Sequence, residues 1–560
     1  MSIEIIYRAI RTERLVPAVL LSLCTLIAQS AQAQTAPDAG TILQQLQPLV
    51  AAPRESKPLN IQAPAAAGLV LPGGAVVVVQ TVSFAGNSVI SQDALQAALG
   101  DVAGKSFDLA GLRSLAARIS DFYRASGFPF ARAVLPPQDL QQGVLRIEII
   151  EGRYGLVQAQ VEGSEAGAQA TQATLFLGSL KPGAVIESAA LERAALLLDD
   201  LPGIKTAPVI RPGTQVGTGD LIVQVSRDKR FTGDVGLDNA GNRYTGQIRA
   251  RANLNLNSPF MLGDQIRINT LVSDEELWLG ALGYSLPLGA SGLRGNGGYS
   301  HTSYVLAKDF SYLQANGTAV VASAGLSYPL VRSQKTNLTL IGIYQAKDLR
   351  DNTDFFSLRE SKSSQSVPVA LQFDHRDSVG GGGITYGSVG WTPGKHKPGP
   401  AAKDEFNTRG GFNKFNLNLV RLQTLPAGFS LMGSISLQAA SKNLDTSEKM
   451  GLGGASGVRA YPTNEAIGDE GVLAQLELRY SAGTYAPYVF VDGGSIKTNA
   501  KPVAGDNKRS LSGGGVGVRY QRNAWSADAA LAWRGTGGAP QADTSGDPKP
   551  RVWVNLGYRF

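Results

Sequence analysis

Side chains that could perform catalysis or bind a metal are few in this sequence and are not arranged for either task. The three histidines, His301, His375 and His396, fall in different predicted strands or loops, without the spacing of a metal site. The glycine-rich stretches 380–383 and 451–454 lack the Lys-Ser/Thr pair of a phosphate loop and indicate turns or bends. A nucleophile elbow leading into a helix is also missing. We therefore expect no catalytic residue, no metal ligand, no cofactor and no enzymatic activity.

The chemistry that remains is electrostatic and centres on Arg459 and Asp492. Side chains alternate along residues 487–492, so one face carries Tyr488, Phe490 and Asp492 and the other carries Pro487, Val489 and Val491. Arg459 lies in the long loop 445–469. It either stays solvated outside or folds inward, where a planar guanidinium suits a two-pronged grip on a carboxylate. The residues alone leave both arrangements open.

The neighbouring segment 470–481 alternates in the same way. Val472, Ala474, Leu476 and Leu478 share one face, and Gln475, Glu477 and Arg479 share the other. If the apolar face meets lipid, the polar face lines a wet lumen and offers further partners to Arg459.

The elements that must position these residues are strands, because strict alternation recurs from residue 231 to the end of the chain. Sixteen strands are predicted, and they start near Phe231, Gln247, Gln265, Trp278, Leu293, Gly317, Asn337, Gln365, Ile384, Gly411, Phe429, Glu470, Ala486, Arg509, Trp525 and Arg551. Short turns alternate with long loops, as they do in membrane barrels. We predict a mainly β fold in which residues 230–560 form a 16-stranded antiparallel transmembrane β-barrel.

The last predicted strand, 551–560, is the strongest single indication of a membrane barrel. Tyr558 and Phe560 share its apolar face, whereas Arg551 and Arg559 share the other. A terminal phenylalanine resembles the signature by which bacterial barrels are recognised for assembly. The alternative, a soluble β-sandwich, is disfavoured by the predicted signal peptide.

The N-terminus has the order of a secretory signal peptide, which we assign to residues 1–33. Three arginines precede the apolar run 15–28, and a small-residue site at 31–33 follows it. The run is too short for a membrane-spanning helix. The only cysteine, Cys24, lies inside this peptide, so the mature chain is expected to hold no disulfide.

Three regions separate the signal peptide from the barrel. Residues 34–75 are rich in Ala, Pro and Gln and indicate a linker with one short amphipathic helix at 41–47. Residues 76–153 and 154–229 repeat the order strand, helix and two closing strands, so each predicts a small α/β domain. Helices are predicted at 91–99, 109–125 and 188–201, and strands at 77–84, 131–135, 144–150, 156–161, 206–211 and 220–225. The net charge of +7 comes without a basic run, so nucleic acid is not an expected partner.

Several short motifs in a fixed order resemble the transporters of two-partner secretion, the hemolysin secretion and activation protein family of the outer-membrane barrel assembly and secretion superfamily. The motifs are Phe84-x-Gly86-Asn87, residues 132–139 with Gly143, Leu201-Pro202-Gly203-Ile204, the loop motif Gly457-Val458-Arg459-Ala460-Tyr461 and the wall motif Phe490-Val491-Asp492-Gly493-Gly494. The resemblance covers nearly the whole mature chain. The loop motif usually has glycine at the position of Ala460, which puts the detailed loop geometry in doubt.

The resemblance implies a transporter that receives an unfolded exoprotein of adhesin or cytolysin type in the periplasm and passes it to the cell surface. It implies that the two α/β units are polypeptide-transport-associated (POTRA) domains, that the N-terminal helix plugs the lumen, and that Arg459 pairs with Asp492. Other implied partners are outer-membrane lipid and, during biogenesis, the barrel-assembly machinery. The alternatives are a factor that assembles other barrels, which usually has more periplasmic repeats, and a passive porin.

Overall fold

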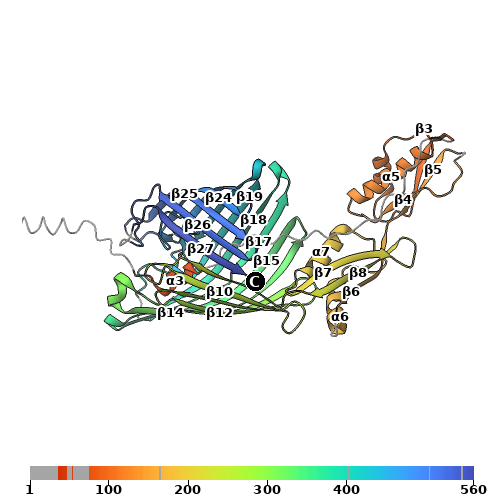
Figure 1. Ribbon diagram of the computed structural model, residues 1–560. Helices are drawn as coiled ribbons and strands as arrows, with labels where there is room; N and C mark the ends of the chain where they lie inside the picture. The colour runs from red at the N-terminus through yellow and green to blue at the C-terminus, as the bar shows by residue number, and fades with distance from the viewer. Residues whose placement is uncertain are drawn as a thin grey trace, which may run out of the picture.

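A computed structural model describes residues 36–46, 53, 73, 75–140, 142–162, 166–400, 403–503, 505–543 and 547–560. A large β-barrel is joined to two small α/β units that extend in line from one of its ends (Figure 1). The predicted signal peptide, most of the linker and residue 47 of the predicted short helix lie outside the described residues.

The barrel is closed and antiparallel, and seventeen strand segments form its wall. They are β9 (Phe231–Asp238), β10 (Arg249–Asn257), β11 (Gln265–Ser273), β12 (Trp278–Pro287), β13 (Arg294–Val305), β14 (Ala315–Arg332), β15 (Thr336–Thr353), β16 (Leu358–Ser366), β17 (Val369–Asp377), β18 (Gly383–Pro398), β19 (Gly410–Thr424), β20 (Phe429–Ala440), β23 (Glu470–Tyr480), β24 (Tyr485–Lys497), β25 (Lys508–Arg522), β26 (Trp525–Arg534) and β27 (Arg551–Arg559).

Sixteen strands cross the wall, as predicted, because β16 and β17 are two parts of one strand. Both pair with β15 and with β18, and only Val367 and Pro368 separate them. Proline has no N–H to donate to a ladder, which explains the interruption. The Pro368 carbonyl still accepts a hydrogen bond from Ile343 N at 3.0 Å, so the wall stays continuous.

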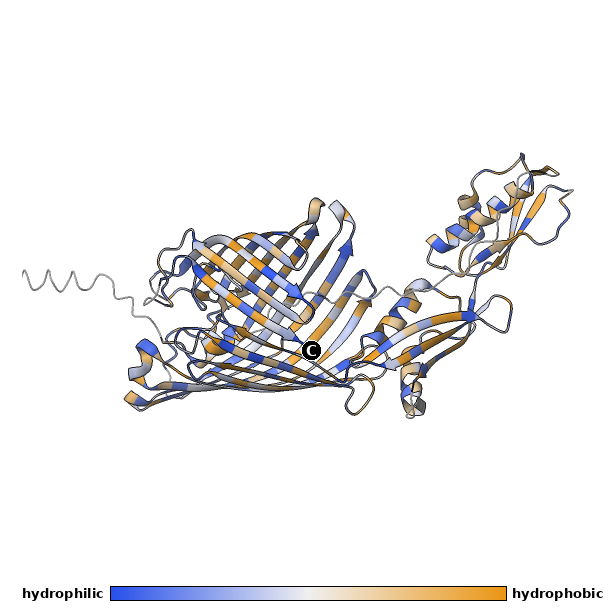
Figure 2. Ribbon diagram, in the orientation of Figure 1, coloured by the Kyte–Doolittle hydropathy of each residue, from blue (hydrophilic) through white to orange (hydrophobic). Residues whose placement is uncertain are grey.

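Alternation decides which side chains face outward. Val489 and Val491 are 51% and 64% exposed, whereas Asp492, the next residue along the strand, is fully buried. Hydrophobic and hydrophilic residues alternate in this way along the barrel strands (Figure 2). An apolar outer face and a polar interior are what a bilayer requires of a spanning barrel. In the part of the chain that the structure describes, no helix is long and apolar enough to cross a bilayer.

The first α/β unit contains two small sheets and two helices. Its elements are β1 (Val77–Val79), β2 (Thr81–Ala85), α4 (Gln92–Leu99), β3 (Lys105–Phe107), α5 (Leu109–Ala125), β4 (Arg132–Val134) and β5 (Val144–Ile150). The predicted first strand is divided at Gln80, so that β1 pairs with β3 and β2 joins the sheet β2-β5-β4. Gly86, at φ +85°, follows β2. The position requires glycine because a side chain there would overlap the Ile149 carbonyl.

The second unit has the sheet order β6-β8-β7 and two helices against it. Its elements are β6 (Arg153–Val161), α6 (Ala166–Phe176), α7 (Ser188–Asp199), β7 (Ile204–Pro212) and β8 (Thr218–Arg227). Sequence analysis did not predict α6. Its sequence is mostly Ala, Gly, Gln and Thr, which gives no clear apolar stripe, although Phe176 at its end joins the unit core.

The second unit is fixed to the barrel by paired polar contacts. The Arg332 guanidinium donates to both carboxylate oxygens of Asp200, at 2.6 and 2.7 Å. Gly203, at φ +82°, passes so close to β10 that a Cβ would lie 2.9 Å from Asn257 Cβ, and Ser258 donates to the Pro202 carbonyl at 2.5 Å. The Leu201-Pro202-Gly203-Ile204 motif therefore forms part of the junction with the barrel.

Helix α3 (Ala39–Gln45) lies in the barrel, toward the end remote from the two units (Figure 1). Asp38 caps it by accepting from Thr41 N at 2.9 Å. Ala39 N donates to Asp351 of β15 at 2.7 Å, and Ile42 is fully buried against wall residues that include Tyr304. A helix this short is marginal alone, so the wall supplies the contacts that hold it.

Candidate functional site

A cluster of charges around Arg459, with its centre buried, is shared by the wall and the long loop. Arg459 Nε and Nη2 each donate to one oxygen of Asp492 at 2.8 Å, and the Arg459 main-chain N donates to the same carboxylate at 3.1 Å. Arg459 is 7% exposed and Asp492 is fully buried. The contact predicted between the loop and β24 is therefore present.

Glu477 of β23 extends this contact into a network. It accepts from Arg459 Nη1 at 2.9 Å, from Arg479 Nε at 2.5 Å and from Arg519 Nη1 at 2.6 Å. Arg519 also donates to Asp528 at 2.7 Å. Three arginines thus face the three carboxylates of Glu477, Asp492 and Asp528. The network carries no net charge, as burial away from water requires.

The wall also fixes Arg459 by contacts that do not involve carboxylates. Its guanidinium carbon lies 3.5 Å from the centre of the Phe490 ring, close enough for a cation–π interaction. The indole Nε1 of Trp553 donates to the Arg459 carbonyl at 2.7 Å. Sequence analysis assigned Trp553 no role, although the alternation of β27 places it on the inner face.

A different packing contact explains the residue type at each position of the loop motif. A Cβ at Gly457 would overlap the Leu452 carbonyl, and Val458 is fully buried. Tyr461 donates its hydroxyl to the carbonyls of Thr536 and Gly538, at 2.9 and 3.0 Å.

Ala460 does not distort the loop. It is not among the residues with positive φ, so alanine is compatible with its backbone. Its Cβ lies against Gly513, where any side chain on the wall would overlap it. On the wall itself, a Cβ at Gly494 would lie 2.7 Å from the Val472 carbonyl and 2.8 Å from Leu452 of the loop.

A second cluster holds the start of the same loop and also holds α3. Lys362 of β16 contacts Asp38 at 2.6 Å and Asp445 at 2.7 Å, and Thr446 donates to Asp38 at 2.7 Å. Burial alone would raise the pKa of Asp38, but Lys362 and the neighbouring hydroxyls hold it below its ordinary value. One lysine therefore links the wall, the loop and the N-terminal helix.

The carboxylate of Glu448 lies next to this cluster, between Lys347 and Lys414, at 2.6 and 2.7 Å. Sequence analysis missed all of these residues. The alternation of β15 and β19 would have placed Lys347 and Lys414 on the inner face, but it gives no sign of which loop carboxylate each would meet.

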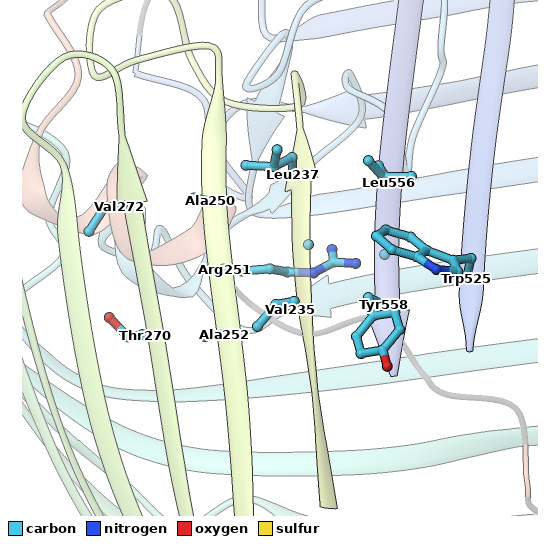
Figure 3. A pocket seen from close by; sticks show the side chains of 12 residues that line it. Val235, Leu237, Ala250, Arg251, Ala252, Thr270, Val272, Trp525, Leu556 and Tyr558 are labelled. Carbon is cyan, nitrogen blue, oxygen red and sulfur yellow. The ribbon is translucent and has the colours of Figure 1, made fainter. Parts of the chain in front are cut away.

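The residues of the C-terminal signature lie elsewhere, on the outer face of the closing strand. Tyr558 packs against Trp525 with ring centres 4.8 Å apart, and Phe560 N donates to the Gly233 carbonyl of β9 at 3.0 Å. A shallow hollow of about 590 Å³ lies beside them, lined among others by Leu237 and Ala252 (Figure 3). Its lining is mostly apolar, with Arg251 and Thr270 as its polar members, and includes no residue of the Arg459 network, so we assign it to the lipid-facing surface of the wall.

Within the described ranges, no three His, Cys, Asp or Glu side chains gather where they could hold a metal ion. The buried charges of the Arg459 and Lys362 clusters are matched by partners of opposite sign and by hydrogen bonds. Such an arrangement fixes the position of a loop and does not activate a nucleophile.

Two family models match the sequence. The model described as haemolysin secretion/activation protein ShlB/FhaC/HecB matches residues 217–520, which is more than half of the chain. The model of the POTRA domain, ShlB-type, matches residues 77–152, the first α/β unit.

Similar proteins agree with these matches. The heme/hemopexin transporter protein HuxB of Haemophilus influenzae (strain 86-028NP) is 28% identical over 449 residues, which covers 77% of this chain and 78% of HuxB. The outer membrane transporter CdiB of Dickeya dadantii (strain 3937) is 26% identical over 441 residues, covering 74% and 75%. The solved structure of CdiB from Escherichia coli superimposes with a TM-score of 0.71 at 20% identity, over 97% of this chain and 98% of that chain.

Proposed function

Because this chain belongs to the haemolysin secretion and activation family of two-partner secretion transporters in the outer membrane, we propose that its POTRA units receive one unfolded exoprotein in the periplasm and that the barrel passes it through the lumen. Neither ATP nor an ion gradient is available at that membrane. Folding of the exoprotein outside removes extended chain from the equilibrium and draws the rest through.

The observation that carries this proposal is the double anchoring of the lumenal loop. One anchor is the Arg459 grip on Asp492, and the other is the lysine cluster around Asp445 and Glu448. A chain can pass only when α3 moves aside while the loop keeps one arrangement against the wall. Two polar anchors suit that task, because matched ion pairs fix one arrangement yet contribute modestly to net stability.

Entry of the exoprotein is assigned to the exposed edge of the first unit. β2 pairs with β5 on one side only, and at the opposite edge of the sheet the Ser120 hydroxyl accepts from Ala133 N at 2.9 Å. The β2 edge is therefore the better place for an extended peptide to add a strand. Main-chain hydrogen bonds give affinity there and demand little of the sequence.

The exoprotein is proposed to be of the adhesin or cytolysin type. One relative is named a heme/hemopexin transporter protein and another a hemolysin transporter protein, so the named cargo differs within the family. Outer-membrane lipid around the wall and the barrel-assembly machinery during biogenesis are the other partners that we propose.

We expect the exoprotein to be encoded next to this gene, and the test is its secretion. Cells that lack the transporter should retain it in the periplasm, and cells with the transporter should release it into the medium. If the release does not depend on the transporter, this proposal is wrong. If the levels of many other outer-membrane barrels fall in cells that lack it, the chain is an assembly factor and the proposal is also wrong.

A further inference from the structure

A second hollow, of about 310 Å³, lies where the second unit meets the mouth of the barrel. Its walls come from two separate parts of the chain. The unit contributes Phe176, Leu197 and Leu201, and the barrel contributes Leu293, Ser327 and Pro329. Neither part alone encloses the space.

The hollow opens toward the lumen. Leu340, next to Thr339, is 42% exposed, so the alternation of β15 turns Thr339 inward. Asp374, which also lines the hollow, pairs with Asn337, which lies on the same face as Thr339. A chain that leaves the POTRA units for the lumen therefore passes this mouth.

One residue of this protein's own linker already contacts the hollow. Pro53, which belongs to the linker between α3 and the first unit, is half-buried and lines it. A proline presents no N–H, so the hollow accepts it through apolar contact and shape. The charged side chains at the rim balance, with Arg294 and Arg332 against Asp200 and Asp374, so the site does not select for net charge.

We propose that this hollow, which Pro53 lines in this structure, is a docking seat for the secreted polypeptide. The ligand class is an extended, largely apolar chain segment. This inference rests on the proposed function, since it names a contact that the exoprotein makes on its route.

The seat is rigid before any chain arrives. The two hydrogen bonds between Arg332 and Asp200 cross from barrel to unit, and Arg193 Nη2 donates to the Pro329 carbonyl at 2.8 Å. A Cβ at Gly292 would lie 2.8 Å from Leu197 Cδ2, so the barrel turn and α7 are in direct contact. A site that needs no rearrangement loses little free energy on ordering when a chain binds.

Photo-crosslinking in intact cells tests the seat. A photoreactive phenylalanine derivative replaces Leu293 in one full-length transporter and Leu288 in another. Leu288 lies in the same turn, is 41% exposed and does not line the hollow. The cells also make the tagged exoprotein encoded next to this gene. Adducts with the exoprotein from position 293, and not from position 288, are the expected result.

Adducts from position 293 with the transporter's own linker alone, in cells that still secrete the exoprotein, would overturn the inference and leave the proposed function intact. Failure of the unmodified transporter to secrete would instead refute the proposed function.

A filling substitution gives an independent measurement. Ser327→Trp occupies the hollow from the lumenal side and should lower secretion about tenfold, which corresponds to the loss of one buried apolar side chain. Ser323→Trp is the matched control, because Ser323 faces the lumen from the same strand outside the hollow. Equal losses in the two variants would mean simple obstruction of the lumen and would contradict a specific seat. Heat-modifiable migration shows that each barrel has folded.

Discussion

Replacing Arg459 with alanine should free the loop and stop most secretion while the barrel still folds. The change removes two hydrogen bonds to Asp492 and one to Glu477. Glu477 keeps Arg479 and Arg519, so its charge stays compensated. Asp492 keeps only the Gln475 amide at 3.3 Å and the main-chain N–H of residue 459.

The magnitude follows from this uncompensated carboxylate. Breaking a buried ion pair from one side costs about 3–5 kcal/mol. Both partners are almost completely buried, so solvent screening does not reduce this figure. At about 1.4 kcal/mol per factor of ten, the docked loop loses roughly a hundredfold to several thousandfold in population relative to the undocked loop.

The assay is the amount of exoprotein in the medium, with heat-modifiable migration as the control for folding. Arg459→Ala and Asp492→Ala should each cut secretion, and Arg459→Lys should cut it less, because lysine keeps the charge but not the planar fork. The double alanine variant should be little worse than either single one, since it leaves no unpaired charge. Losses that add in full would show that the two residues do not act as a pair.

Three further predictions concern the other parts of the chain. Deleting residues 38–55 should raise ion conductance in planar bilayers and leave secretion largely intact. Lys362→Met should raise the conductance less, because it removes only the partner of Asp38. Unchanged conductance in the deletion variant would contradict a plug. Val82→Pro should abolish binding of the exoprotein's N-terminal segment to the full-length transporter, because the main chain of Val82 points away from β5; normal binding by the folded variant would rule out the β2 edge. Burial raises the pKa of Glu151, but hydrogen bonds from the side chain and main chain of Ser88 and from Val89 N outweigh it and lower that pKa. The carboxylate therefore stabilises the fold above its ordinary pKa of 4.5 and loses this contribution as the pH falls below that value; thermal unfolding of the POTRA units should show this acid sensitivity in the wild type and not in Glu151→Gln.

The barrel was predictable because each strand repeats one local rule. Alternation alone located the sixteen strands, and most observed strands start within two residues of the predicted position. The exception is the eighth, which begins at Leu358 and not near Gln365. Its first half is polar on both faces and extends beyond the apolar band, so alternation gives no signal there.

The contacts between distant segments were less accessible to sequence analysis. Alternation turned Asp492 and Glu477 inward, but only the family resemblance indicated that Arg459 would reach them. Lys362 shows most clearly which contacts sequence analysis could not predict. Asp38 and Lys362 come from an isolated short helix and from a strand far along the chain, and no local pattern sets their relative position. Helix α6 was not predicted for a different reason, because its small residues lack the apolar period by which helices are recognised.

The seam between β27 and β9 has a consequence for biogenesis. The ladder there covers Asn555–Arg559 and Asp234–Asp238. Phe560 and Gly233 add two hydrogen bonds at one end, and at the other end Asn239 bonds to Val552 and Val554 in place of a strand. These two strands come from opposite ends of the barrel sequence, so the weakest ladder also closes the largest loop. Closure therefore has the highest entropic cost of any pairing and is expected to come last in folding. A chain that stops before residue 551 would keep two open edges, which makes it a template for aggregation during its passage to the membrane.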